Sequence, residues 1–311
     1  MGHLVCMDDD PAELTLSAWS LELWRTLTPQ LPESCAWRGC GTLWLAETPE
    51  ELEIAREKQR RLASHEVNSE MQSAAQLAER EVMLRPGLSG GLWVPGDGIV
   101  YAPNVARWFI ANAGDKLTHL VDPAIRLEEP TVTLQSGRQL RADAIVVACG
   151  LGANTLLGEP WLRAKKGQRA KIGHLPITYR YGPLVNHQLV ELGYGASAHG
   201  GGTSVAFNVQ PRPTGQLLIG SSRQFDNEDR ELDLPLLAAM LSRAQHFLPS
   251  LATLNIIRCW SGFRAASQDG NPLLGPHPSR AGVWLALGHE GLGVTTAPAS
   301  ASLLAAQLLG E

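Results

Sequence analysis

The chain has 311 residues, of which 44% are hydrophobic and 18% are charged, and its formal net charge is −5. This composition is typical of a soluble globular protein of one or two domains, and it excludes a disordered chain and a basic nucleic-acid-binding protein. No apolar run approaches the roughly 18 to 20 residues that span a bilayer, so we expect no transmembrane segment, and no secretory leader is visible.

The five cysteines include no C-x-x-C pair and have no His-rich segment beside them. We therefore expect neither a zinc site nor a disulfide framework, but the reduced, partly buried thiols of a cytoplasmic protein. Asp8, Asp9 and Asp10 are consecutive, and consecutive carboxylates in an extended chain cannot all converge on one ion. We interpret them as a solvated loop or a helix cap and expect no metal site.

The first half of the chain alternates predicted helices with short predicted strands. Helices are predicted over residues 12–27, 48–64 and 103–112, a buried strand over 40–46, a turn over 93–98 and a hairpin over 131–140. Residues 143–150 read DAIVVACG, a continuous apolar run of the kind that is buried on both faces of a parallel sheet.

The character of the chain changes between about residues 165 and 257, which are rich in Gly, Pro and short apolar alternations. This segment predicts a second, mostly antiparallel domain inserted into the first, with a strand over 216–222 and a helix over 234–247. The chain then returns with a buried strand over 283–287 and an apolar helix over 297–309 that Gly310 caps.

Two stretches near the C-terminus carry the clearest chemical signal. Residues 260–275 read WSGFRAASQDGNPLLG and residues 283–297 read VWLALGHEGLGVTTA. The second predicts a strand, a glycine-rich turn in which Gly288, Gly291 and Gly293 allow positive φ, and a helix that starts near residues 295–298. That order brings backbone N–H groups and a helix N-terminus close to a flat or anionic ligand.

A third glycine motif follows the strand at 143–150. Gly150 and Gly152 fit the start of a dinucleotide fingerprint, but Thr155 replaces the third glycine and no acidic residue follows about 20 residues on. We favour a strand-to-loop exit at which small residues let the backbone approach a cofactor. The alternative is an ordinary core strand that ends in glycine.

Taken together, these motifs resemble the D-amino-acid oxidase, glycine oxidase and sarcosine oxidase family of FAD-dependent oxidoreductases, and among them the bacterial D-amino-acid and D-hydroxyproline dehydrogenases. The stretches that carry the resemblance, in the family's order, are residues 39–46, 93–103, 143–150, 166–168 and the C-terminal block. The resemblance implies an α/β (α+β) fold, with a doubly wound FAD-binding domain of the glutathione-reductase type and an inserted antiparallel-sheet substrate domain. It also implies oxidation of a small amino or imino acid by hydride transfer from Cα to flavin N5, with electrons passing to an acceptor or a partner subunit.

The resemblance divides the chain into two discontinuous domains. The FAD-binding domain is expected to comprise residues 1–14, 97–165 and 256–311. The substrate domain is expected to comprise residues 15–96 and 166–255.

By resemblance, Arg264 binds the substrate carboxylate, a task that suits the fork of a guanidinium group. Ala265 and the pair Ser267-Gln268 replace the proline and the Thr-Pro of the family pattern. Two roles stay open for Glu290, as an acceptor of a hydrogen bond from a substrate amine or as a solvated carboxylate. His289 is the third candidate catalytic residue, and packing is its alternative role.

The resemblance also places one C-terminal segment along the isoalloxazine ring, where the positive end of a helix dipole favours the negative charge of a reduced flavin. The candidate cofactor-binding residues are Gly2, His3, Cys149, Gly150, Gly288, Gly291, Leu292, Gly293, Val294 and Thr295.

The family pattern begins with a strand, a G-x-G-x-x-G turn, a helix and a second strand, which together need about 30 residues or more. Met1 falls after this unit, so we expect a chain that starts there to fold poorly or to hold FAD weakly. We favour a misassigned start codon. The alternatives are a truncated, non-catalytic relative that acts as a binding or assembly subunit, and a unit supplied by another chain.

Overall fold

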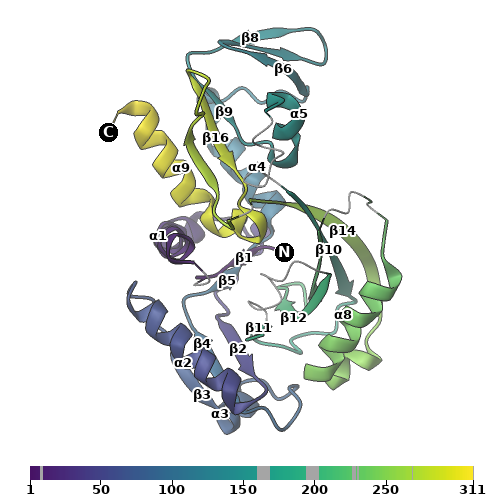
Figure 1. Cartoon of the computed structure of the whole chain (residues 1–311). Helices are drawn as coiled ribbons and strands as arrows, with labels where there is room; N and C mark the ends of the chain where they lie inside the picture. Colours follow the sequence, from purple (N-terminus) through teal and green to yellow (C-terminus); the bar gives the residue numbers. More distant parts are fainter. Residues whose placement is uncertain are drawn as a thin grey trace.

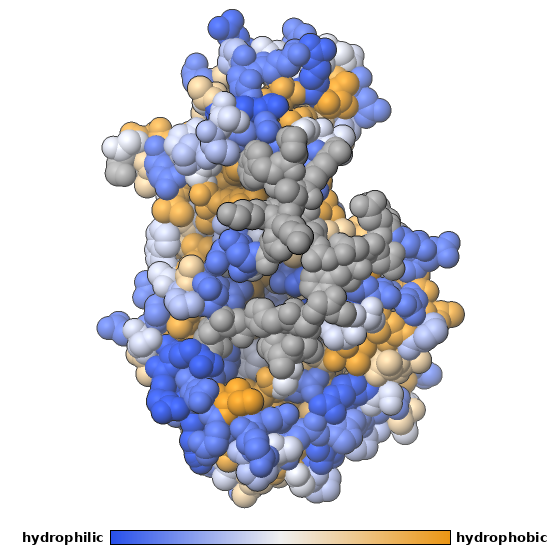
Figure 2. Space-filling model, viewed as in Figure 1, coloured by the Kyte–Doolittle hydropathy of each residue, from blue (hydrophilic) through white to orange (hydrophobic). Residues whose placement is uncertain are grey.

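The computed structural model describes residues 1–7, 10–159, 169–193, 203–225, 229, 231–267 and 269–310. A broad lower part is built on one large sheet, and an upper part is built on two small sheets (Figure 1). The upper part is the narrower of the two (Figure 2). This mixed α/β architecture agrees with the predicted fold class, while the domain boundaries stay a prediction.

The large sheet has eight strands in the order β14-β10-β13-β12-β11-β2-β4-β3. Its strands are β2 (Thr42–Ala46), β3 (Glu70–Ser73), β4 (Gly90–Val94), β10 (Arg169–Thr178), β11 (Gln188–Glu191), β12 (Ser204–Pro211), β13 (Leu217–Phe225) and β14 (Ile256–Ala266). Neighbouring strands are antiparallel except β11 and β2, which run parallel. The strand expected at residues 40–46 therefore lies in the same sheet as the strands of the segment between about residues 165 and 257, which was predicted to be antiparallel.

Helix α8 (Leu234–Phe247) packs against β12 and β13 and covers one face of the large sheet (Figure 1). Phe207 of β12 stacks on Phe247 of α8 with ring centroids 4.4 Å apart, and both side chains are fully buried. Because successive side chains of a strand point to opposite faces, the side chains next to Phe207 along β12 face away from α8. That second face forms the floor of the candidate site.

The upper part contains two three-stranded sheets, with the orders β15-β16-β9 and β6-β7-β8. The strands are β6 (Ala124–Glu128), β7 (Thr131–Leu134), β8 (Gln139–Arg141), β9 (Ile145–Val147), β15 (Leu273–Pro276) and β16 (Val283–Leu287). The hairpin predicted over 131–140 is present as β7 and β8. A further pair, β1 (His3–Leu4) with β5 (Gly98–Ile99), lies between the upper and lower parts (Figure 1).

The prediction that residues 143–150 form a strand buried on both faces is wrong. Only Ile145–Val147 pair with a neighbour, and Val146 is 45% exposed. The reason is position: β9 is the edge strand of its sheet and pairs along one side, with β16, among the described residues. Apolar composition alone does not distinguish such an edge strand from a central one.

Four of the predicted helices are present within one residue of their expected ends: α1 (Pro11–Leu27), α2 (Pro49–Ala63), α4 (Ala102–Asn112) and α8. Two short helices were not predicted, α3 (Ala74–Arg80) and α5 (Ala153–Leu157), and the last helix is α9 (Gly293–Leu309). The last helix starts earlier than expected, at Gly293, because the turn before it closes as a single 3-10 turn over Glu290–Leu292. The helix-cap interpretation is confirmed for Asp10, whose carboxylate accepts hydrogen bonds from the amides of Ala12 and Glu13. Asp8, Asp9 and residues 166–168 lie outside the described residues.

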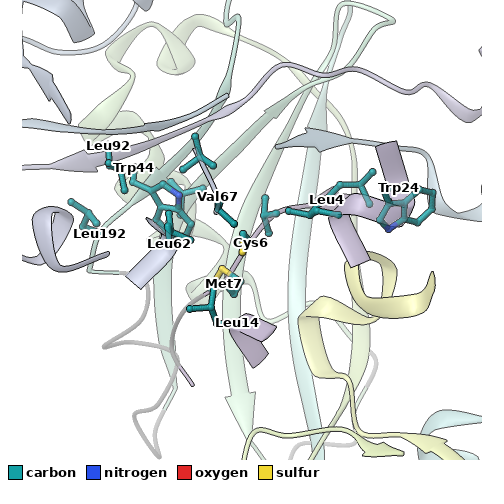
Figure 3. Packing of buried hydrophobic residues seen from close by; sticks show 14 of the residues in the cluster. Leu4, Cys6, Met7, Leu14, Trp24, Trp44, Leu62, Val67, Leu92 and Leu192 are labelled. Atoms are coloured by element: carbon teal, nitrogen blue, oxygen red, sulfur yellow. The ribbon is translucent and has the colours of Figure 1, made fainter. Parts of the chain in front are cut away.

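Helices α1 and α9 pack side by side, and a large core cluster extends from them into the lower part (Figure 3). Trp24 of α1 lies at one end of this cluster and Trp44 of β2 lies toward the other. In the part of the chain that the structure describes, one helix, Glu290–Leu309, is long and apolar enough to cross a bilayer. Two of its residues, Ala299 and Thr295, are fully buried in the protein. The helix therefore fits a core helix as well as it fits a membrane span.

Candidate active site

Strands β10, β13 and β14 bring three cations to one face of the large sheet. Lys171 of β10 is paired directly with Arg264 of β14, so the two side chains project from the same face. Gly173, two residues further along β10, projects to that face as well. A Cβ atom on Gly173 would lie 2.7 Å from Nη2 of Arg264, so the guanidinium lies over the bare backbone of this glycine. Arg223 of β13 is the third cation.

Glu290 lies opposite these cations, in the turn between β16 and α9. Its Oε1 is 3.1 Å from Nζ of Lys171 and 3.9 Å from Nε of Arg223. Burial alone would raise the pKa of Glu290, but the positive charges of Lys171, Arg223 and Arg264 outweigh it and hold that pKa below its usual value. Glu290 is therefore an ionised carboxylate, and Arg264 lies on the side of the site that faces it.

The two C-terminal motifs meet at this turn. Ala266, at the end of β14, forms an isolated antiparallel bridge with His289. Nε2 of His289 lies 3.0 Å from the hydroxyl oxygen of Ser300 in α9, and burial lowers the pKa of His289. The imidazole is consequently neutral at pH 7 and is held against α9. Its catalytic role stays a prediction.

The conformation of the glycine turn differs from the expected one. Gly288 has a positive φ of 76°, as predicted, but Gly291 and Gly293 do not, because both belong to helical turns. The other left-handed residue is Glu290, with φ 45°. A non-glycine side chain in this region is uncommon and marks a position that the surrounding contacts fix. Here the ion pair with Lys171 is such a contact.

His3 lies partly buried among polar side chains beside the same face of the sheet. Its Nδ1 lies 2.5 Å from Oε1 of Gln188 and 2.7 Å from Nε2 of Gln210, and its Nε2 lies 3.1 Å from Nδ2 of Asn208. Burial lowers the pKa of His3 to about 3. The carbonyl oxygen of His3 accepts a 2.9 Å hydrogen bond from the hydroxyl of Thr295. Two candidate cofactor-binding residues from opposite ends of the sequence are thus in direct contact.

The other candidate cofactor-binding residues contribute backbone or packing. A Cβ atom on Gly2 would lie 2.0 Å from the carbonyl oxygen of Val100, so this position requires glycine. Gly150 has a φ of 56°, and a Cβ atom there would lie 4.0 Å from Cβ of Ala265, so the loop after β9 approaches the end of β14. Cys149 is exposed beside it. The side chains of Leu292 and Val294 pack against the core cluster around α1.

These residues fit the ring end of a flavin. A Cβ atom on Gly291 or on Gly262 would meet no atom within 4 Å among the described residues, so open space adjoins both the turn and β14. Helix α9 begins at Gly293 and directs the positive end of its dipole toward this turn. A negatively charged flavin would be stabilised there by the helix N-terminus and by the cations of the floor.

The polar floor of the site belongs to no sequence motif. Its side chains are all buried, namely those of Lys171, Arg223, Gln188, Asn208 and Gln210. One signal was available: each is a polar residue inside a strand whose remaining residues are largely apolar. Buried polar side chains at alternate strand positions indicate a face that binds something other than a hydrophobic core.

The fold and the site together define a mixed α/β protein in which the two C-terminal motifs meet beside the polar face of the large sheet. Residues 2–307 match the model of the family described as FAD dependent oxidoreductase. The chain belongs to this family. The predicted fold class and FAD as the cofactor of the family are thereby confirmed.

The chain is also similar to individual proteins of known name. The chain is 29% identical over 232 residues to a glycine oxidase of Geobacillus kaustophilus, a match that covers 70% of this chain and 55% of that protein. It is 24% identical over 305 residues to an opine oxidase subunit of Rhizobium meliloti, covering 93% of this chain and 76% of the relative. The first of these matches thus spans about half the length of the glycine oxidase.

Solved structures show the same fold. The crystal structure of the Geobacillus kaustophilus glycine oxidase has a TM-score of 0.84 at 22% identity, covering 100% of this chain and 83% of that one. An iminodiacetate oxidase from Chelativorans sp. BNC1 has a TM-score of 0.84 at 22% identity, covering 100% of this chain and 85% of that one. At such identities the likeness concerns the fold alone.

Proposed function

We propose that the full-length protein is an FAD-dependent oxidase or dehydrogenase of a small amino or imino acid. The observation that carries this proposal is the position of Arg264, whose guanidinium lies over Gly173 on the sheet face opposite the Glu290 turn. The relatives named glycine oxidase, opine oxidase and iminodiacetate oxidase support amines that bear a carboxylate as substrates. Substrates of the D-amino acid, D-hydroxyproline and glycine or sarcosine types are all included.

When bound, the flavin would accept a hydride from the substrate Cα at N5. The residues of this chain would bind and orient the substrate. Arg264 would hold its carboxylate through two parallel hydrogen bonds. Glu290, an ionised carboxylate, would accept a hydrogen bond from the amine and so fix the direction of the Cα–H bond. His289, held by Ser300, would keep the turn in place beside the ring.

Two further parts of the proposal concern the setting of the reaction. Electrons would pass to an acceptor or a partner subunit, since the opine oxidase relative is itself named as one subunit of an oxidase. The protein would act in the cytoplasm, a location with which its five free cysteines agree.

The test is reduction of the flavin under anaerobic conditions in the full-length protein. Glycine, sarcosine, D-alanine, D-proline and D-hydroxyproline would be added in turn while the flavin absorbance is recorded. We expect bleaching by at least one of them, and an Arg264→Met variant should need about 10 to 100 times more substrate for half-maximal bleaching. A flavin that stays oxidised with every amino and imino acid would refute the proposal.

A further inference from the structure

A buried histidine lies beneath the site, on the opposite face of the large sheet. His174 follows Gly173 in β10, and because successive side chains of a strand point to opposite faces, its imidazole lies on the face that carries α8. The side chain is fully buried. Burial lowers the pKa of His174, although the charge of Asp233 opposes this, and the imidazole is neutral at pH 7. A buried neutral ring of this kind acts through its hydrogen bonds, which the protein itself must provide.

The backbone amide and both ring nitrogens of His174 have partners. The amide donates a 2.8 Å hydrogen bond to the hydroxyl oxygen of Ser222 in β13, and Nδ1 lies 2.8 Å from the same oxygen. Nε2 accepts a 3.2 Å hydrogen bond from the amide of Asp233, the residue that caps α8. The side chain of Gln224 in β13 donates to the carboxylate of Asp233 at 2.8 Å. His174 thus links β10, β13 and the start of α8.

This link lies in an irregular stretch of the β10–β13 ladder. Ile172 pairs with Gln224 and Ile177 pairs with Leu218, so β13 has one residue more than β10 between these pairs. Within this stretch the amide of His174 donates to a side-chain hydroxyl, where a regular antiparallel ladder would provide a backbone carbonyl. Such bulges change the direction in which strand residues point. The hydroxyl therefore takes the place of a ladder carbonyl and determines how β13 lies against β10.

The position of β13 at this point bears directly on Arg264. From the point that a Cβ atom on Gly173 would occupy, the backbone carbonyl oxygen of Ser222 is 3.0 Å away and Nη2 of Arg264 is 2.7 Å away. The carbonyl and the guanidinium are therefore neighbours beside the same bare backbone. Arg223, the next residue of β13, reaches the site, where its Nε is 3.9 Å from Oε1 of Glu290. A shift of Ser222 would change both the surroundings of the guanidinium and the direction of Arg223.

We propose that His174 is a positioning residue of the active site, which acts through the hydroxyl of Ser222 to fix the guanidinium of Arg264 over Gly173. This inference rests on the proposed function for the role of Arg264 in binding the substrate carboxylate. It adds a residue on the far face of the sheet that controls substrate binding without lying on the face that holds the substrate. The hydrogen bonds of the imidazole perform this task, so a ring of similar size without nitrogen atoms should not replace it.

The position of the guanidinium gives the first test, and it does not depend on turnover. Crystal structures of the full-length, FAD-loaded protein would be compared for the unaltered chain, His174→Phe and Ser222→Ala. We expect the guanidinium of Arg264 to leave its place over Gly173 in both variants, because each removes the hydrogen bond between the ring and the hydroxyl. His174→Asn, whose side-chain amide can replace Nδ1, should keep the guanidinium in place.

A guanidinium that stays over Gly173 in the variants without this hydrogen bond would overturn the inference. Ser222→Ala removes a single oxygen atom, so it decides the question even if His174→Phe does not fold.

Substrate binding gives the second test. In His174→Phe and in Ser222→Ala, the substrate concentration for half-maximal flavin reduction should rise about 10-fold, while the limiting rate of reduction stays within about 3-fold. The double variant should show about the same 10-fold rise as each single variant, because both changes break one link. Effects that multiply to about 100-fold would show that the two residues act independently, and would count against the inference.

The control is Phe207→Leu, which weakens the packing of α8 on the same face of the sheet. It should leave the substrate concentration for half-maximal reduction within about 2-fold of the unaltered protein. An equal rise in this variant would mean that a general loss of stability weakens substrate binding, and it would overturn the inference.

The two tests separate this inference from the proposed function. Displacement of the guanidinium together with weaker substrate binding would support both. Displacement with unchanged substrate binding would support the positioning of Arg264 by His174 and refute the role of Arg264 in the proposed function. If no amino or imino acid reduces the flavin, the proposed function is refuted, and the crystal structures still decide whether His174 fixes Arg264.

Discussion

The indole nitrogen of Trp24 donates a 2.9 Å hydrogen bond to the backbone carbonyl of Thr295. This contact links helix α1 to the start of helix α9. Pro298 lies inside the helix, and the amide of Ala299 donates a 3.2 Å hydrogen bond to the hydroxyl of Ser20 in α1. Helix α1 thus contributes two side-chain hydrogen bonds to the start of the helix that borders the candidate flavin site.

We predict that Trp24→Phe lowers the free energy of unfolding by about 1–3 kcal/mol, because it removes a hydrogen bond between two buried residues. Urea unfolding would measure the loss. Trp19→Phe is the control, since Trp19 lies on the same helix and is partly exposed. An equal, small effect of both changes would mean that the Trp24 contact contributes little.

Asp97 should make the protein less stable as the pH rises. Its carboxyl group is fully buried and accepts a hydrogen bond from the amide of Cys6, and burial raises its pKa from 3.8 to about 7. Between these two pH values the folded state binds more protons than the unfolded state. Stability therefore falls as the pH rises from about 4 to about 7, by at most about 1.4 kcal/mol per pH unit.

The variant that tests this is Asp97→Asn, which cannot ionise. Its free energy of unfolding, measured by urea denaturation at several pH values, should lack the downward slope between about pH 4 and pH 7. A slope identical to that of the unaltered protein would show that Asp97 does not titrate in this range.

His3 should act in the opposite direction. Burial lowers its pKa from 6.5 to about 3, so between these values the unfolded state binds more protons. Stability is therefore lost as the pH falls from about 6.5 toward 3. His3→Gln keeps an amide that can bond the neighbouring Gln188 and Asn208, and it should reduce this acid sensitivity. The measurement is the same series of urea denaturations. A variant with undiminished acid sensitivity would contradict the prediction.

The sequence predicts those elements whose bounds are determined by residues close to them in the chain. Helix α8 and strand β16 were predicted with their observed bounds, because periodicity, proline and glycine act within a few residues. The strand at residues 143–150 was predicted too long and too buried, because its position at a sheet edge is a property of the tertiary structure.

The candidate site also contains residues that the sequence predicts and residues that it does not. Arg264 and Glu290 stand out in the sequence because they belong to recognisable motifs. Lys171 and Arg223 do not, since their significance arises from register: Lys171 reaches the site because β10 pairs with β14 at Arg264. Cross-strand partners of this kind are far apart in the chain, and a single sequence does not reveal them.

Gly173 provides a direct test of the position of Arg264. A Cβ atom at this residue would lie 2.7 Å from Nη2 and 3.1 Å from Cζ of the guanidinium, and 3.0 Å from the carbonyl oxygen of Ser222. We predict that Gly173→Ala displaces the guanidinium and raises the substrate concentration for half-maximal flavin reduction about 10-fold, because the paired hydrogen bonds to the carboxylate require a fixed geometry. Gly262 is its cross-strand partner, and an added Cβ there meets no described atom within 4 Å, so Gly262→Ala controls for the effect of an added methyl group on folding of these strands. If Gly173→Ala folds with its flavin and binds substrate as the unaltered protein does, Arg264 does not hold the carboxylate from its position over Gly173.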